Sequence, residues 1–215
     1  TISHELRTPL NGIVGLSRMV RDTELTEEQF TWISTIYASA ITLGNIFNDI
    51  IDLDKLERDK ISLSYKTLSL ETFTAELSSV IELLAADKGL QFVSNIIKPL
   101  PDFVQVDGTR LRQILWNMLF NAVKFTPKGQ VSLSVSATVQ DDNKTANVCF
   151  DIQDTGVGIP QADLDKIFAM YYQVDHPDHQ SATGTGIGLA ICKEMVGRMN
   201  GHIEVQSEVG KGTRF

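Results

Sequence analysis

Residues 1–60 repeat apolar positions at spacings of three and four, which is the pattern of amphipathic helices. The first stripe covers Ile2–Val20 and the second covers Ile33–Ile50. A capping box at Thr26–Gln29 predicts the start of the second helix, and the short connector Arg21–Leu25 makes the helices antiparallel neighbours. Because a lone hairpin cannot cover both stripes, we predict that two copies pair as a homodimer in a four-helix bundle.

From about Ser62 the pattern becomes mixed. Helices are expected at Glu71–Lys88, Thr109–Phe125 and about Ile187–Met199, and Gly89 is a suitable residue to end the first of them. Strands are expected at Ser62–Leu70, Gln91–Ile97, Gln130–Val139, Ala146–Gln153, Ile203–Val205 and Thr213–Phe215. The third and fourth strands flank a polar turn, which indicates a hairpin. The whole chain is therefore predicted to be α+β, with a helical hairpin at 1–62 and a two-layer α/β sandwich at 63–215.

Composition and charge narrow the function. The chain has 215 residues, 42% of them hydrophobic, and a formal net charge of −8. An acidic balance argues against binding nucleic acid or an anionic membrane surface, although a local pocket can still hold an anionic nucleotide. No apolar run is long enough to insert in a membrane, and the two cysteines favour a reducing, cytosolic setting without a disulfide or zinc site. Both ends look cut, so we expect an excised functional core.

The first chemical candidate is the segment Ser3–Leu10 of the first helix. With Ile2 facing the bundle, His4 is rotated by about 200° to the solvent side, beside Glu5, and Thr8 follows four residues later on the same face. An imidazole beside a carboxylate can act as a nucleophile, with the carboxylate accepting its proton. The alternative is a solvated surface histidine next to an incidental glutamate.

The second candidate is a polar face on an apolar helix. Asn117, Asn121 and Lys124 are spaced by four and three, so they project from one face. Two amides and an ammonium there suit a hydrated Mg²⁺ and phosphate oxygens. Ordinary helix-surface polarity is the alternative.

Two glycine-rich segments complete the set. Asp154 is followed by Gly156 and Gly158 in a sharp turn after a strand, where a buried carboxylate could accept a hydrogen bond from the exocyclic amine of adenine; a simple turn before a helix explains the same letters. Residues Gly184–Leu189 run directly into a helix, where backbone N–H groups and the helix dipole favour phosphate. The polar stretch Met170–Thr183 before them is either a lid over a nucleotide or a disordered loop.

Taken together and in this order, these segments resemble the H, N and G boxes of sensor histidine kinases, over essentially the whole chain. Three further segments, Asn45–Asp52, Asp107–Trp116 and Ile167–Val174, are similar to one subgroup, the hybrid kinases of anoxic redox control. The resemblance implies a dimerisation and phosphotransfer hairpin followed by a Bergerat-type ATP-binding domain. One departure is visible, since many members have a second phenylalanine where this chain has Tyr171 and Tyr172.

The resemblance also implies a role for each matching residue. His4 would be the phosphoacceptor, Glu5 its general base, and Thr8 would orient water for dephosphorylating a partner. Asn121, helped by Asn117, would hold Mg²⁺. The remaining residues implied at the ATP site are Lys124, Asp154, Gly156, Gly158, Phe168, Tyr172, Gly184, Thr185, Gly186, Ile187, Gly188, Leu189 and Thr213.

The implied reaction is ATP-dependent phosphorylation of His4, followed by transfer to an aspartate of a receiver domain, either separate or fused. Because His4 and the ATP site lie on different domains, a hinge near residues 57–66 is expected. The resemblance places the fragment in the cytoplasm, as part of a bacterial sensor anchored in the inner membrane. A kinase-dead dimeric adaptor and a Bergerat-fold ATPase remain as alternatives, and a phosphatase activity stays open.

Overall fold

The two sequence patterns correspond to two separate units of structure. The computed structural model describes residues 2–57, 62–140, 144–174 and 185–215. Contacts within the chain divide it into one unit at Thr1–Ile61 and another at Ser62–Phe215. The hinge predicted near 57–66 lies partly outside the described residues, and so does most of the polar stretch Met170–Thr183, for which a lid and a disordered loop were the two interpretations.

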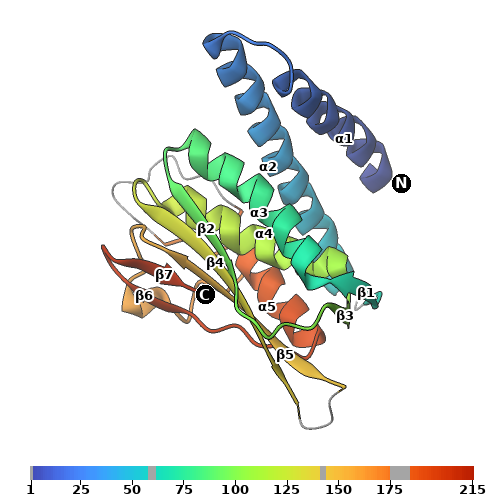
Figure 1. The fold of residues 1–215 in the computed structure, drawn as a ribbon, viewed down its shortest axis with the longest axis vertical. Coiled ribbons are helices and arrows are strands. Elements are labelled where there is room, and N and C mark those ends of the chain that lie inside the picture. Colours follow the sequence, from blue (N-terminus) through green and yellow to red (C-terminus); the bar gives the residue numbers. More distant parts are fainter. Residues whose placement is uncertain (1, 58–61, 141–143, 175–184) are drawn as a thin grey trace. The chain divides into compact units, whose positions relative to one another are not determined.

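The first unit is an antiparallel pair of helices, α1 (Ile2–Arg21) and α2 (Glu27–Glu57) (Figure 1). The predicted capping box is confirmed, because the Gln29 N–H donates to Thr26 Oγ1 at 3.2 Å and the Thr26 N–H donates to Gln29 Oε1 at 3.0 Å. The Arg21 guanidinium lies over the rings of Phe30 and Tyr37, 5.3 and 5.2 Å from their centroids. These contacts fix where the chain reverses, and the pairing of the helices agrees with the sequence.

Much of the apolar stripe on this unit stays in solvent. Leu16 is 66% exposed on α1, and Leu43 is 58% exposed on α2. Other large apolar side chains of the two helices are also exposed, namely Ile13, Met19, Val20, Phe30, Trp32, Ile36 and Ile50. Within the described residues, one copy of the hairpin therefore leaves many large apolar side chains in contact with water, which is unfavourable.

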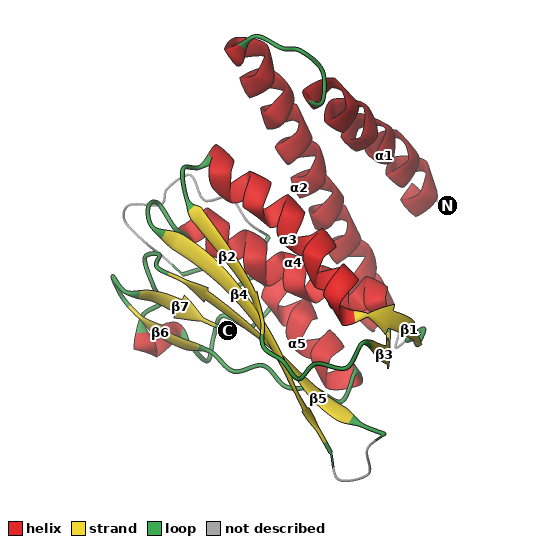
Figure 2. Cartoon of the chain, viewed as in Figure 1, coloured by secondary structure: helices red, strands yellow, loops and turns green. Residues whose placement is uncertain are grey.

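The second unit has a five-stranded sheet with helices on one face (Figures 1 and 2). The strands run in the order β2-β4-β5-β7-β6, with β2 parallel to β4 and the other neighbours antiparallel. Their bounds are β2 Gln91–Ile96, β4 Gln130–Val139, β5 Ala146–Asp154, β6 Gln206–Glu208 and β7 Gly212–Arg214. Side chains alternate along β4, so that Val131, Leu133 and Val135 are fully buried and the intervening serines are not.

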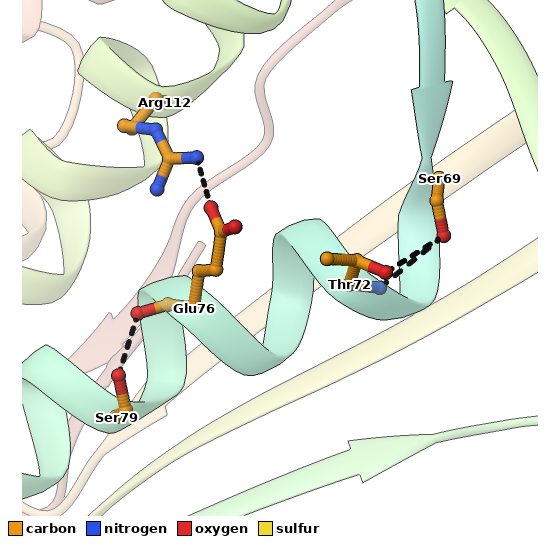
Figure 3. Close-up of polar contacts among 5 residues, drawn as sticks. All are labelled: Ser69, Thr72, Glu76, Ser79 and Arg112. Atoms are coloured by element: carbon orange, nitrogen blue, oxygen red, sulfur yellow. Dashed lines mark hydrogen bonds and ion pairs between the residues drawn. The ribbon is translucent and has the colours of Figure 1, made fainter.

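Three helices cover the buried face of this sheet: α3 (Leu70–Asp87), α4 (Gly108–Phe125) and α5 (Gly188–Arg198) (Figure 2). Ser69 caps α3, since its hydroxyl oxygen accepts from the Thr72 N–H (Figure 3). Gly89 follows the C-cap with φ +70°, as the predicted end of this helix requires. Helices on one face of a mostly antiparallel sheet give the predicted two-layer sandwich.

Two predicted strands are wrong in their bounds. The segment Ile203–Val205 alternates correctly but forms no strand, because the partner β7 is only three residues long and pairs with Gln206–Glu208. The predicted strand Ser62–Leu70 is shortened to β1 (Lys66–Ser69), since its last residue Leu70 already belongs to α3. In both places the pairing partner, which the local pattern does not contain, sets the length of the strand.

One element is missing from the sequence prediction altogether. Strand β3 (Phe103–Val106) pairs antiparallel with β1 in a separate two-stranded sheet, with Lys66 opposite Val106 and Ser69 opposite Phe103. Its four residues leave too short an alternation to recognise. This ribbon leads directly into the N-terminus of α4, where the Asp107 carboxylate accepts from the Thr109 and Arg110 N–H groups.

Candidate ATP-binding site

The site begins with the C-terminal half of α4. Leu115, Met118 and Leu119 bury one side of this helix against the domain core. Asn117, Asn121 and Lys124 are only partly buried and lie on the other side. Burial lowers the pKa of the Lys124 ammonium, and the nearby charge of Lys88 lowers this pKa further. An apolar helix therefore presents two amides and a cation on a face that is partly withdrawn from water.

The two asparagines differ in their surroundings. The Asn117 amide donates to Cys192 Sγ on α5 at 3.7 Å, which ties the two helices together. The Asn121 side chain makes no hydrogen bond to any other residue that the structure describes. A half-buried amide without a protein partner is costly unless a ligand or water completes it. Asn121 is thus the better placed of the two to hold an additional group.

Asp154 is the last residue of β5 and its side chain is buried, with 6% exposed. Its Oδ1 accepts from the Gly156 N–H at 2.8 Å and from the Thr213 N–H at 3.2 Å. Burial raises the pKa of this carboxyl, and the two backbone hydrogen bonds oppose the shift. Within the described residues Oδ2 has no donor, so it can accept a hydrogen bond from a ligand amine.

The glycines let the backbone of this turn approach its neighbours closely. A Cβ on Gly156 would overlap the Phe125 carbonyl at the end of α4, and a Cβ on Gly158 would overlap the Glu208 carbonyl. Gly158 also has φ +73°, which other residues adopt at a cost. The Val157 N–H donates to Phe125 O at 3.2 Å. These contacts join the Asp154 turn directly to the helix that carries Asn121 and Lys124.

The β6–β7 hairpin closes another side of the turn. Gly212 has φ +109°, and a Cβ there would overlap the backbone of Asp154. Thr213 is 7% exposed, and besides its N–H bond to Asp154 its hydroxyl lies 2.9 Å from Ser207 Oγ. Ser207 Oγ also accepts from the Ile159 N–H at 2.8 Å. Thr213 was implied at the site by resemblance, whereas Ser207 was missed, because a single serine in a three-residue strand gives no signal by itself.

The start of α5 provides the second glycine-rich segment. Gly186 has φ +69°, and its carbonyl accepts from the Tyr171 N–H at 2.9 Å. Thr185 Oγ1 accepts from the Ile187 N–H at 3.3 Å, and Ile187 is buried. Gly188 and Leu189 form the first turn of the helix, whose N–H groups and dipole favour an anion. Gly184 lies outside the described residues.

Two aromatic residues flank this segment. Tyr172 donates its hydroxyl to Asp163 Oδ1 at 2.6 Å, which lowers the pKa of the Asp163 carboxyl. The Phe168 ring meets the Phe215 ring edge-on at 6.4 Å, and Lys193 Nζ lies 5.1 Å from the centroid of Phe168. The tyrosine that departs from the family pattern thus gains a hydrogen bond that a phenylalanine cannot make.

The remaining candidates lie on the other unit. His4 and Glu5 are in α1, and their side chains are outside the described part of the structure. Thr8 follows one turn later on α1 and is exposed. The ATP-site candidates are therefore brought together within the second unit, while the phosphoacceptor candidates belong to the first.

A cavity of about 350 Å³ lies at the opposite end of α4. It is lined by Ser64, Lys66, Thr67, Leu68, Phe73, Val106, Asp107, Gly108, Thr109 and Arg112. None of the predicted site residues lines it, and its position at the β1–β3 ribbon separates it from the glycine-rich segments. The predicted site residues of the second unit lie instead where α4, α5 and the Asp154 turn meet.

Comparison with protein-family models gives the class of protein to which the chain belongs. The model of the His Kinase A (phospho-acceptor) domain matches residues 1–59, and the model of the histidine kinase-, DNA gyrase B- and HSP90-like ATPase matches residues 106–215. The chain belongs to this ATPase family. A phospho-acceptor domain followed by an ATPase domain is the catalytic core of a sensor histidine kinase.

Sequence identity to individual proteins shows which histidine kinases the chain resembles. The chain is 55% identical to the aerobic respiration control sensor protein ArcB of Escherichia coli K12 over 216 residues, covering 100% of this chain and 27% of that protein. It is 37% identical to the signal transduction histidine-protein kinase BarA of the same strain, covering 100% of this chain and 23% of that protein. The chain thus spans about a quarter of the length of these curated relatives. The subgroup resemblance seen in the sequence is confirmed.

A solved structure agrees with the fold. Full-length ShkA in complex with AMPPNP is 35% identical, with a TM-score of 0.70, and the match covers 100% of this chain and 43% of that chain. The arrangement of a helical region followed by an α/β ATP-binding domain is therefore shared, and the predicted fold class is confirmed.

Proposed function

We propose that this chain uses ATP to phosphorylate its own His4 and passes the phosphoryl group to an aspartate of a receiver domain. The observation that carries the proposal is the convergence of Asn121, Lys124 and Asp154 in one unit, connected in the same chain to a phospho-acceptor helix. The proposed division is 1–62 for dimerisation and phosphotransfer and 63–215 for ATP binding.

Asp154 is proposed to recognise the adenine. One carboxylate oxygen is held by the Gly156 and Thr213 N–H groups, so the other is fixed in direction. It would accept a hydrogen bond from the exocyclic amine, which guanine lacks at that position. Phe168, Tyr172 and the segment Gly184–Leu189 would surround the rest of the nucleotide, with the first turn of α5 facing the phosphates.

Asn121 is proposed to hold Mg²⁺, helped by Asn117. The residues fit this ion, because Mg²⁺ prefers oxygen ligands and keeps several waters and substrate phosphates around few protein groups. Within the described ranges no cluster of His, Cys, Asp and Glu side chains suits a metal, and a site of this kind needs none. When bound, the ion would neutralise charge on the transferring phosphate. Lys124 would add a second positive charge nearby.

The chemistry at His4 is nucleophilic. An imidazole nitrogen bonds to the γ-phosphorus as the bond from that phosphorus to the ADP oxygen breaks, which yields ADP and phosphohistidine. Glu5 holds the other imidazole N–H and accepts its proton. In phosphoryl transfer the protein contributes mainly position and electrostatic stabilisation. Thr8 would orient water for removing phosphate from a partner regulator.

Exposed apolar side chains support a homodimer. Among the described residues, Leu16 and Leu43 on this stripe are largely exposed, and packing the stripe against a second copy would give the four-helix bundle. A membrane-spanning helix needs about 20 mostly apolar residues. Among the described residues, no helix is long and apolar enough to span a membrane. We propose that the chain is the cytoplasmic part of a membrane-anchored bacterial sensor, with a receiver domain as partner and no role in nucleic acid binding.

Incubation with γ-labelled ATP and Mg²⁺ tests the function. We expect an acid-labile label on the protein, which then moves to a receiver domain when one is added. Nucleotide binding without any label would favour the kinase-dead adaptor. Steady release of phosphate from an unlabelled protein would favour a clamp-type ATPase.

A further inference from the structure

The end of α4 lacks the usual helix-ending motif. The last carbonyls of a helix have no partner inside the helix, and a glycine often supplies the turn that satisfies them. Here the C-cap is Thr126 in an extended conformation, with φ −101° and ψ 107°. The next residue, Pro127, has no N–H to donate. Donors must therefore come from elsewhere in the domain.

Lys88 supplies most of them. Its Nζ donates to the carbonyl oxygens of Val123, Lys124 and Thr126, at 2.8, 2.7 and 3.2 Å. An ammonium has three N–H donors, so this contact uses all of them. The positive charge also lies at the negative end of the helix dipole, where it is favourable.

The other two carbonyls have their own donors. Thr126 Oγ1 donates to Ala122 O at 2.6 Å, and the Val157 N–H of the Asp154 turn donates to Phe125 O at 3.2 Å. The last turn of α4 is thus held between Lys88, the C-cap of α3, and the turn that carries Asp154. Lys124 belongs to this last turn, and Asn121 directly precedes it.

We propose that Lys88 is a positioning residue for the nucleotide site, which fixes the last turn of α4 and so sets Asn121 against the Asp154 turn. The inference rests on the proposed function of Asn121 and Asp154. Lys88 acts through α4 and does not contact the nucleotide. Its charge also lies close enough to lower the pKa of the Lys124 ammonium, and the repulsion between the two cations is relieved when anionic phosphates bind.

A second bridge between the same helices provides a matched control. Arg112 Nη2 on α4 bonds Glu76 Oε2 on α3 at 2.7 Å (Figure 3), and the guanidinium lies 4.9 Å from the centroid of the Phe73 ring. Arg112 precedes Lys124 by twelve residues, which is about 18 Å along a helix. Losing this bridge weakens α3–α4 packing far from the site.

The test compares Lys88→Met, Lys88→Arg and Arg112→Met with the wild-type chain. ATP affinity is measured by calorimetry with Mg²⁺ and with EDTA, and thermal unfolding is recorded for each variant. We expect Lys88→Met to lose about 10-fold in affinity with Mg²⁺ and less with EDTA, because its effect passes through Asn121. Lys88→Arg should fall between Lys88→Met and wild type, since it keeps a cation at the helix end. Arg112→Met should change both affinities by less than about 2-fold.

Two results would overturn the inference and leave the proposed function intact. One is wild-type ATP affinity in Lys88→Met, and the other is an equal loss of ATP affinity in Lys88→Met and Arg112→Met. If Lys88→Met does not fold, Lys88→Arg decides. A Mg²⁺-dependent loss at an unchanged unfolding temperature then supports the inference, and wild-type affinity refutes it. A wild-type chain that binds no ATP would refute the proposed function, and the role of Lys88 with it.

Discussion

The two units of this chain differ in how they bury their apolar side chains. In the ATP-binding unit the inward-facing side chains of β4 are covered by the helices, with Leu133 at 0% exposure. In the hairpin, Leu16 and Leu43 are 66% and 58% exposed. The ATP-binding unit buries its core within one chain, and the exposed side chains of the hairpin support the proposal that it packs against a second copy. ATP binding and assembly are thus proposed to belong to different units, while the phosphoacceptor candidate His4 lies on the hairpin.

Leu16→Glu tests the assembly half of this comparison. In a two-fold dimer each of the two copies would bury one introduced carboxylate. We therefore expect the free energy of dimerisation to weaken by about 4 kcal/mol, which is about 1000-fold in dimer affinity. Analytical ultracentrifugation over a range of concentrations measures it. Phe103→Glu is the control, because Phe103 is also 66% exposed but lies on the ATP-binding unit. Equal dissociation by both variants would contradict the assignment.

Leu133→Ala tests the other half. Removing a fully buried side chain from the sheet should lower the free energy of unfolding of the ATP-binding unit by about 3 kcal/mol. Calorimetry should show this loss in a transition that does not depend on protein concentration, while the hairpin transition, which does, stays in place. A single shared transition, lowered as a whole, would show that the units are not independent.

Asp154→Asn separates function from stability within the ATP-binding unit. The Gly156 and Thr213 N–H groups hold the single amide oxygen, so an NH₂ group replaces the oxygen that would face the adenine amine, and we expect about 100-fold weaker ATP binding. Burial raises the pKa of the Asp154 carboxyl. The folded state therefore binds a proton that the unfolded state has released, and wild-type stability falls as pH rises above about 4, the ordinary value, through the raised pKa.

Asp154→Asn has no carboxyl to titrate, so it lacks this loss of stability with rising pH. Without nucleotide it should therefore unfold at a higher temperature than wild type at pH 7. Near pH 4 the two should converge. Thermal melts across this pH range provide the check. Wild-type ATP affinity in the variant would contradict the role given to Asp154 in adenine recognition. A lower unfolding temperature at pH 7 would contradict the stability cost assigned to its burial.

Local patterns in the sequence predicted most of this structure. The capping box at Thr26, the end of α3 at Gly89 and the hairpin of β4 and β5 are each encoded within a few residues. The Asp154 turn could also be located, because its glycines leave a local mark. The predicted roles of the site residues stay predictions.

Features that depend on distant partners could not be predicted. Strand β3 is too short to recognise without β1, and the bounds of β6 depend on β7. Lys88 bonds the end of a helix more than thirty residues later in the chain. No spacing pattern marks it, so its contact with α4 is visible only in the folded structure.

The central claim is that His4 receives the phosphoryl group and that a separate unit binds the ATP. The most direct measurement is labelling with γ-labelled ATP of the wild type, His4→Gln and Asp154→Asn, with ATP binding measured on the same samples. We predict no label on either variant, wild-type ATP binding by His4→Gln, and weak binding by Asp154→Asn. Acid-labile label persisting on His4→Gln would contradict the account.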